Sequence, residues 1–176
     1  MSDTLITIVA IALAAVLMFI FPLMTMSDRT DDVSQLTVET ATTEFVDEIR
    51  TTGKITEDKY SKFVEAIGST GNTYDVEIEV QVLDENPGKK TTQAANKKIG
   101  ENVYYSVYTS QIVDKLEDNR QGNVYKLKEG DIVSVSVKNT NQTLSQQLKN
   151  FFYTIVGNDT YTIAASHGGI VSATGK

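Results

Sequence analysis

The residue types that most often carry chemistry are scarce in this chain. It has no cysteine and one histidine among 176 residues, which argues against a structural zinc site built from Cys and His ligands. The histidine, His167, directly follows Ser166, but neighbouring residues on a strand point to opposite faces and make a poor nucleophile–base pair. The chain has no G-x-S-x-G motif of the kind that positions a nucleophilic serine. We therefore interpret His167 as an exposed turn residue, and we expect no enzyme activity and no cofactor.

Two groups of acidic residues are candidates for metal binding. Neither has the D-x-D-x-D-G spacing of a calcium loop, so we expect no metal site and interpret both groups as solvated helix faces. The formal net charge of −7 argues against a nucleic-acid partner, which needs a basic surface, and no small-molecule substrate is evident. The two groups are Asp28, Asp31 and Asp32, and Asp114, Glu117 and Asp118.

The strongest signal lies near the N-terminus. The twenty residues from Leu5 to Met24 carry no charge, and as a helix they would be about 30 Å long, which matches the hydrocarbon core of a bilayer. A secretory signal peptide would need a basic start and a small-residue cleavage site, and a buried core helix is rarely apolar over such a length. We therefore predict a transmembrane anchor over residues 1–27.

The flanks of this anchor set its expected direction. Arg29 follows the apolar run among several aspartates, while the N-terminal flank carries no Lys or Arg, so the positive-inside rule gives little guidance. An acidic, cysteine-free domain suits the cell exterior. We therefore expect a single-pass membrane protein whose residues 28–176 form one extracytoplasmic domain.

The anchor helix is expected to continue into this domain. Val38, Phe45 and Ile49 recur at helical spacing between acidic residues, which predicts an amphipathic helix that packs on the domain through these three side chains. Pro22 is expected to kink the rod near the membrane, because proline removes one helical hydrogen bond. Residues 28–52 are thus predicted to extend the anchor helix, and Gly53 is a plausible C-terminal cap.

The rest of the chain mixes short strands with helices. Alternating apolar and polar residues predict strands, and apolar residues at helical spacing predict helices capped by residues such as Thr56 and Ser110. The resulting fold class is α+β, an N-terminal transmembrane helix continuing into an amphipathic helix, packed with further helices on a small antiparallel sheet. The expected strands are 74–82, 103–109, 132–138 and 160–165, the expected helices 56–67, 110–116 and 142–156, and the expected turns 86–88, 128–131 and 168–169.

Two surfaces could mediate contacts. Ala10 and Ala14 form a small-xxx-small pair in the anchor, and small residues let membrane helices approach closely. Tyr104, Tyr105 and Tyr108 could supply a binding surface on the sheet.

The N-terminal layout resembles that of type IV pilins and pseudopilins. The resemblance rests on Thr4-Leu5-Ile6, Val9-Ala10-Ile11, Ala14-Ala15 and Pro22, and the C-terminal phrase NFFYTIVGNDTYTIAASHGGIV is similar to pilin-like proteins of tight-adherence and conjugation machinery in Gram-positive bacteria. The family usually has a glutamate where Thr7 stands here, which favours an accessory component over a major filament subunit. The resemblance implies a structural or assembly role at the cell surface, with self-association or other pilin-like subunits as partners. A membrane-tethered binding module is the alternative.

Overall fold

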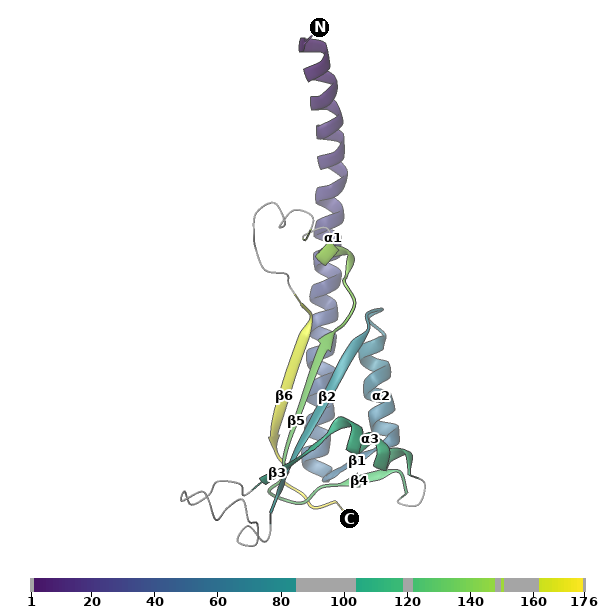
Figure 1. The fold of residues 1–176 in the computed structure, drawn as a ribbon, viewed down its shortest axis with the longest axis vertical. Helices are drawn as coiled ribbons and strands as arrows, with labels where there is room; N and C mark the ends of the chain where they lie inside the picture. Colours follow the sequence, from purple (N-terminus) through teal and green to yellow (C-terminus); the bar gives the residue numbers. More distant parts are fainter. Residues whose placement is uncertain (1, 85–103, 119–121, 148–149, 151–161, 176) are drawn as a thin grey trace, which may run out of the picture.

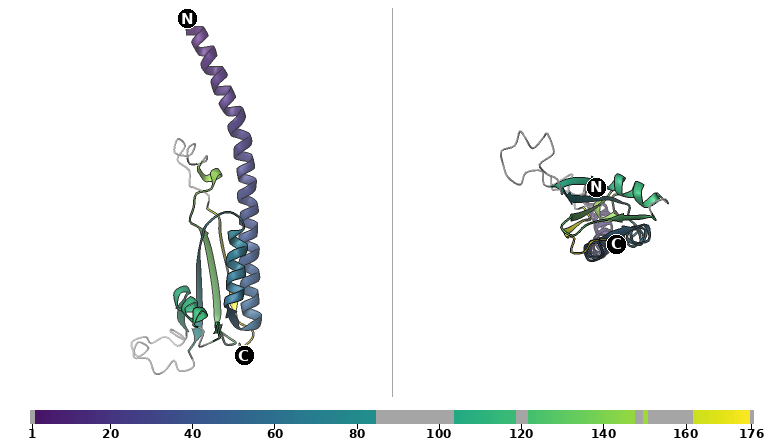
Figure 2. Two further views of the ribbon diagram at one scale, coloured as in Figure 1. Left: turned by 90° about the vertical axis from the view of Figure 1, so that its right-hand side faces the viewer. Right: turned by 90° about the horizontal axis from the view of Figure 1, so that it is seen from below.

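The structure is a computed structural model, which describes residues 2–84, 104–118, 122–147, 150 and 162–175. Its dominant element is α1 (Ser2–Thr52), a single helix that runs without interruption through Pro22. Figure 1 shows the N-terminal half of α1 projecting beyond the other elements, and Figure 2 shows that the helix curves gently over its length. By length and composition, α1 is the one helix in the described part of the chain that could cross a membrane.

Two antiparallel sheets make up the strand content of the described residues. The larger has the order β3-β2-β5-β6 and the smaller pairs β1 with β4, which confirms the predicted α+β class. The strands of the larger sheet are β2 (Tyr74–Leu83), β3 (Tyr104–Tyr108), β5 (Ile132–Asn139) and β6 (Ala164–Ile170). Those of the smaller sheet are β1 (Lys54–Thr56) and β4 (Val124–Lys126).

The hydrophobic core lies between the large sheet and a helical layer. In Figure 2 the distal half of α1 and α2 (Glu57–Gly68) stand side by side along one face of the sheet. Alternate β5 residues Val133, Val135 and Val137 face this layer and are fully buried, as the period of two in a half-buried strand requires. The short helix α3 (Thr109–Glu117) follows β3 directly and contributes Ile112 and Leu116 to the core.

The break between α1 and the next elements depends on Gly53. Its φ of +66° is a left-handed conformation, and its N–H donates to the carbonyl of Ile49 at 2.8 Å, so it ends the helix as predicted. β1 follows immediately, and Thr56 then caps α2 by accepting a hydrogen bond from the N–H of Lys59. The predicted cap at Thr56 is confirmed, whereas α3 begins one residue before the predicted cap Ser110.

The expected turn at Gly168–Gly169 is wrong. Both glycines lie inside β6, which pairs with β5 from Ala164 to Ile170. A Cβ at Gly168 would lie 2.9 Å from the carbonyl oxygen of Val133, and one at Gly169 would lie 2.6 Å from Nε of Arg50. Glycine at these two positions therefore lets the backbone of β5 and the Arg50 side chain pack close to β6. The two glycines do not mark a turn.

Several expectations fall outside the described residues. They include the turn at 86–88 and most of the helix predicted at 142–156, of which the structure describes Leu144–Gln147 and Asn150 as helical.

Candidate functional site

The N-terminal half of α1 presents a largely exposed apolar surface. Ala10, Ala14 and Pro22 are all exposed, and most of the bulkier side chains between Leu5 and Met26 are 49–76% exposed. A surface of this size and length is far larger than the apolar patches of ordinary soluble monomers. It can be covered by lipid, by the helices of neighbouring chains, or by both.

The other half of α1 is built into the core. Val38, Phe45 and Ile49 are 0%, 4% and 0% exposed. Phe45 stacks on Phe63 of α2 with ring centroids 4.5 Å apart, and Tyr60 of the same helix lies tilted at 6.5 Å. One helix therefore supplies both the candidate membrane anchor and a wall of the folded domain.

A pair of carboxylates marks the boundary between these two halves. Asp31 is 5% exposed and accepts a hydrogen bond from the Thr143 hydroxyl at 2.7 Å, while Asp28 accepts one from the Ser145 hydroxyl. We call these two contacts the hydroxyl–carboxylate clamp. It fastens residues 143–147 against α1 near the end of the apolar run. The interpretation of Asp28 and Asp31 as solvated residues is therefore wrong, and Asp32 alone of that group is exposed.

The three tyrosines proposed as one surface do not form one. In β3, Tyr104 and Tyr108 stand opposite Leu83 and Glu79 of β2 on the outer face of the sheet, and Tyr105 stands opposite Val82 on the other face. The alternation of side chains along a strand explains this separation. Tyr105 instead lines a cavity together with residues of α3 and β4, two elements that Figure 1 shows at the end of the molecule away from the N-terminal half of α1.

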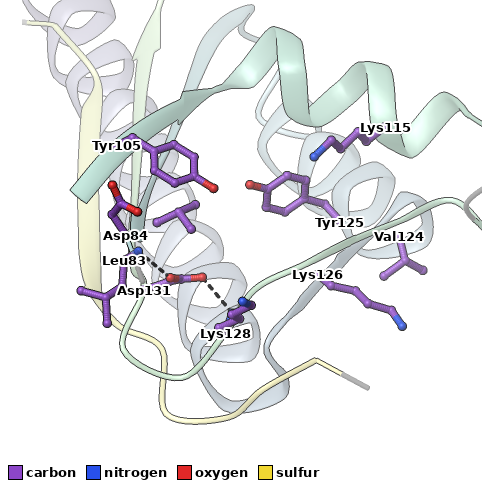
Figure 3. A pocket seen from close by; sticks show the side chains of 10 residues that line it. Leu83, Asp84, Tyr105, Lys115, Val124, Tyr125, Lys126, Lys128 and Asp131 are labelled. Carbon is purple, nitrogen blue, oxygen red and sulfur yellow. Dashed lines mark hydrogen bonds between the residues drawn. The ribbon is translucent and has the colours of Figure 1, made fainter. Parts of the chain in front are cut away.

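This cavity has a volume of about 500 Å³ and lies between the end of β2, β3, α3 and β4. Figure 3 shows the hydroxyl groups of Tyr105 and Tyr125 directed toward each other from opposite walls. The lining combines apolar and aromatic side chains with five charged ones, so it is more polar than most small-molecule pockets, which are lined predominantly by apolar groups. The lining residues are Val82, Leu83, Asp84, Tyr105, Lys115, Val124, Tyr125, Lys126, Lys128 and Asp131.

Tyr125 and Asp131 organise the charges of this cavity. Burial of the Tyr125 phenol, with smaller contributions from Tyr105 and Asp131, raises its pKa to about 12, so it remains a neutral hydrogen-bond donor at physiological pH. The Lys115 ammonium lies 4.8 Å from the centroid of the same ring, a cation–π distance. Asp131 is 2% exposed and accepts from the backbone N–H groups of Leu83 and Lys128. These last two bonds hold the wall of the cavity in place.

His167 lies in β6 and not in an exposed turn, so that interpretation is wrong. Its Nε2 is 3.6 Å from Oδ1 of Asp47, which also binds Arg50 at 2.8 Å. Ser166 points to the other face of the strand, and in the register of β5 and β6 it stands opposite Ser136. No serine–histidine pair for nucleophilic chemistry forms here.

Among the described residues, no group of three or more His, Asp or Glu side chains is arranged to hold a metal ion.

Comparison with known proteins does not assign this chain to a family. No protein-family model matches it, and no curated protein or solved structure is significantly similar to it. Its function has to be inferred from its own geometry.

Proposed function

We propose that the chain is a structural component of an assembly at the cell surface, a pilin-like subunit or accessory protein of a filament or transfer apparatus. The observation that carries the proposal is the dual role of α1, which is bare and apolar over its first half and a wall of the core over its second. A helix of this kind fixes the folded domain rigidly to the membrane or to neighbouring anchors. An independently moving tethered domain would instead need a flexible linker.

In this proposal the N-terminal half of α1 spans the bilayer and residues 28–176 lie outside the cytoplasm. The partners are the membrane and other copies of the chain, or pilin-like subunits with a similar helix. Ala10 and Ala14 lie one turn apart on one side of α1 and permit close approach of a second helix. A helix of 3.6 residues per turn places Ala12 on roughly the opposite side.

Cysteine cross-linking in native membranes tests the assembly. The chain has no native cysteine, so Ala10→Cys and Ala14→Cys each introduce one reactive thiol. We expect cross-linked dimers from both and a much lower yield from the matched control Ala12→Cys. A strictly monomeric outcome from all three variants would contradict the proposal. Electron microscopy of sheared surface material would then establish whether the copies form filaments.

The orientation has its own test. Thr40 is exposed on α1 beyond the apolar run, so Thr40→Cys should react with a membrane-impermeant maleimide on intact cells. Labelling only after lysis would place the domain in the cytoplasm.

A second candidate function is a membrane-tethered binding module, and the cavity of about 500 Å³ between Tyr105 and Tyr125 favours it. The full chain in detergent would be screened by thermal shift against simple sugars and small carboxylates. If a ligand binds in the cavity, it should raise the Tm of the chain. Tyr105→Ala should abolish this increase in Tm, and Tyr108→Ala, on the outer face, should preserve it. A panel that produces no shift, or one unaffected by Tyr105→Ala, would count against this function.

A further inference from the structure

The outer edge of β6 is covered at both ends and bare in the middle. Ile163 and Val171 exchange backbone hydrogen bonds with the β5 side, so the alternation of an antiparallel ladder directs the backbone groups of the even-numbered residues away from β5. Gln35 bonds the N–H and carbonyl of Ala164, and Arg50 bonds the carbonyl of Ile170. Ser166 and Gly168 lie between these two covered positions. Among the described residues, no side chain bonds their outward-facing backbone groups.

The opposite edge of the sheet, β3, has a matching pattern. Ile78 of β2 directs its N–H toward the β3 side, where Thr109 accepts it, so the even residues of β2 face β3. Tyr105 and Val107, which stand opposite them, are therefore bonded to β2, and Tyr104 and Ser106 direct their backbone groups outward. Tyr108 is also outward-facing, but its N–H is taken by the Gln111 side chain.

Neither edge strand carries the residue types that often protect an exposed edge. Exposed edge strands are normally blunted by lysine, proline or an inward-pointing charge. The sequences Tyr104–Tyr108 and Ala164–Ile170 contain no charged residue and no proline. Each edge thus presents two adjacent outward-facing residues that can still form a ladder.

We propose that β6 of one copy pairs with β3 of a second copy, so that the sheet continues from subunit to subunit. This inference rests on the proposed assembly function and specifies its contact. Because the four strands alternate in direction, β3 and β6 run in opposite senses. Two copies whose anchors point the same way therefore bring β6 and β3 together antiparallel. Pairing β6 with a second β6 antiparallel would point the two anchors in opposite directions, which one membrane does not allow.

The outward-bonding residues of β3 and β6 also have their side chains on the same face of the sheet. Ser106, Gln81, Ile132 and Ile170 lie on one rung, so the outward-bonding residues of both edges carry their side chains on the outer face. When the two edges pair through hydrogen bonds, the outer faces of the two sheets become one continuous outer face. The helical layers of the two copies then lie on the same side of the extended sheet. A mismatch of one residue at either edge would have inverted the second copy.

The bare positions fix the register. Ser166 stands opposite Ser106 of the second copy, and Gly168 stands opposite Tyr104 of the second copy. The Tyr104 ring, 39% exposed, then covers the edge glycine, an arrangement known to stabilise cross-strand pairs. This register offsets the second copy by four residues, about 13 Å along the strands. Repeated head to tail, such a contact builds a helical stack of copies and not a closed two-fold dimer. Each added copy carries its anchor about 13 Å further along the stack, so only the copies at the base of the stack keep their anchors in the bilayer, which is about 30 Å thick.

Disulfide cross-linking of the full chain in cells tests the contact. Ser106→Cys and Ser166→Cys are co-expressed on separate chains and oxidised, and opposed residues of an antiparallel pair are close enough for a disulfide. We expect a heterodimer from this pair and none from Ser166→Cys with Ser134→Cys, whose serine lies on the same face in the central strand β5. Efficient dimers from Ser166→Cys alone would overturn the proposal in favour of a β6–β6 contact.

Further variants separate the possible failures. The double variant with both cysteines in one chain should give a ladder of oligomers, and dimers alone would overturn the head-to-tail arrangement. Tyr104→Ala should lower the cross-linking yield about threefold. If Ala10→Cys cross-links but the Ser106–Ser166 pair does not, the edge contact is wrong and the assembly stands. If neither cross-links, the proposed function itself fails.

Discussion

The side-chain amide of Gln35 bonds both backbone groups of Ala164, donating to its carbonyl at 2.7 Å and accepting from its N–H at 3.0 Å. Gln35 thus occupies the place of a peptide group from a neighbouring strand. One side chain of α1 covers the start of β6 in this way and fixes the distance between helix and sheet. Backbone groups at a sheet edge are satisfied here by a helix that is 129 residues away in the chain.

Replacing Gln35 should therefore loosen the helix–sheet contact. We expect Gln35→Ala to lower the free energy of unfolding by about 1–2 kcal/mol, because two hydrogen bonds at a partly exposed site are lost. Denaturant titration of the full chain in detergent measures the change. Thr40→Ala, at an exposed position on the same helix, is the control and should change the stability by less than about 0.5 kcal/mol.

The hydroxyl–carboxylate clamp predicts strong coupling between two distant residues. Asp31→Ala removes the acceptor of the buried Thr143 hydroxyl and should cost about 2–3 kcal/mol of unfolding free energy. Thr143→Val removes the donor, and the double variant should cost clearly less than the sum of the two. A double-mutant cycle measured by denaturant titration checks this, and strict additivity would mean that the two side chains do not interact.

Phe45 should be among the most sensitive positions of the core. Its ring stacks on Phe63 and is 4% exposed, so Phe45→Ala should destabilise the domain by about 3–5 kcal/mol through lost burial and a residual cavity. Leu36→Ala on the same helix is the matched control, since Leu36 is 65% exposed. Thermal unfolding followed by circular dichroism should show a large decrease in Tm for the first variant and almost none for the second.

Gly53 should tolerate no side chain. Its φ is +66°, and a Cβ would lie 2.2 Å from the carbonyl oxygen of Ala173, so Gly53→Ala combines backbone strain with a backbone clash. We expect a loss of at least about 2 kcal/mol. Gly68→Ala meets no atom within 4 Å and should be neutral or slightly stabilising. Equal stabilities of the two variants, measured by chemical denaturation, would contradict this account of the helix end.

The phenol of Tyr125 makes stability depend on alkaline pH. Its pKa is about 12 in the folded protein, against the ordinary tyrosine value of 10.0 that applies to the unfolded chain. Between these values the folded state holds a proton that the unfolded state has released, so stability is retained below pH 10 and falls as pH rises toward 12. Denaturant titrations across this window should show a shallower decline for Tyr125→Phe. An identical slope in both proteins would exclude Tyr125 as the cause.

Elements with strong local patterns were predictable from the sequence. Apolar and polar residues alternate in Tyr74–Leu83 and Ile132–Asn139, and this pattern is compatible only with a half-buried strand. The acidic and apolar faces of α1 define which side of the helix is buried. The strands β1 and β4 were not predicted, because three residues are too short to show a period. Gly168 and Gly169 were misassigned because the reason for glycine is the proximity of Val133 and Arg50, which only the folded chain reveals.

The candidate site was less accessible to sequence reasoning. The split of Tyr104 and Tyr105 between two faces follows from strand alternation and could have been anticipated. The contacts of Asp28 and Asp31 could not, because their partners Ser145 and Thr143 are more than one hundred residues away and carry no charge. Polar contacts between distant segments leave no periodic signal in a single sequence.

Because α1 has no break, a movement of its N-terminal half moves the folded domain with it. From the end of the apolar run near Met26, the helix continues for about 26 residues, roughly 39 Å, into the folded domain. A tilt of the anchor by about 20°, ordinary for a membrane helix, would swing the far end of the domain sideways by more than about 10 Å. If α1 spans a bilayer as proposed, changes in bilayer thickness or a pulling force on its N-terminal half would therefore be transmitted as rotation of the whole sheet.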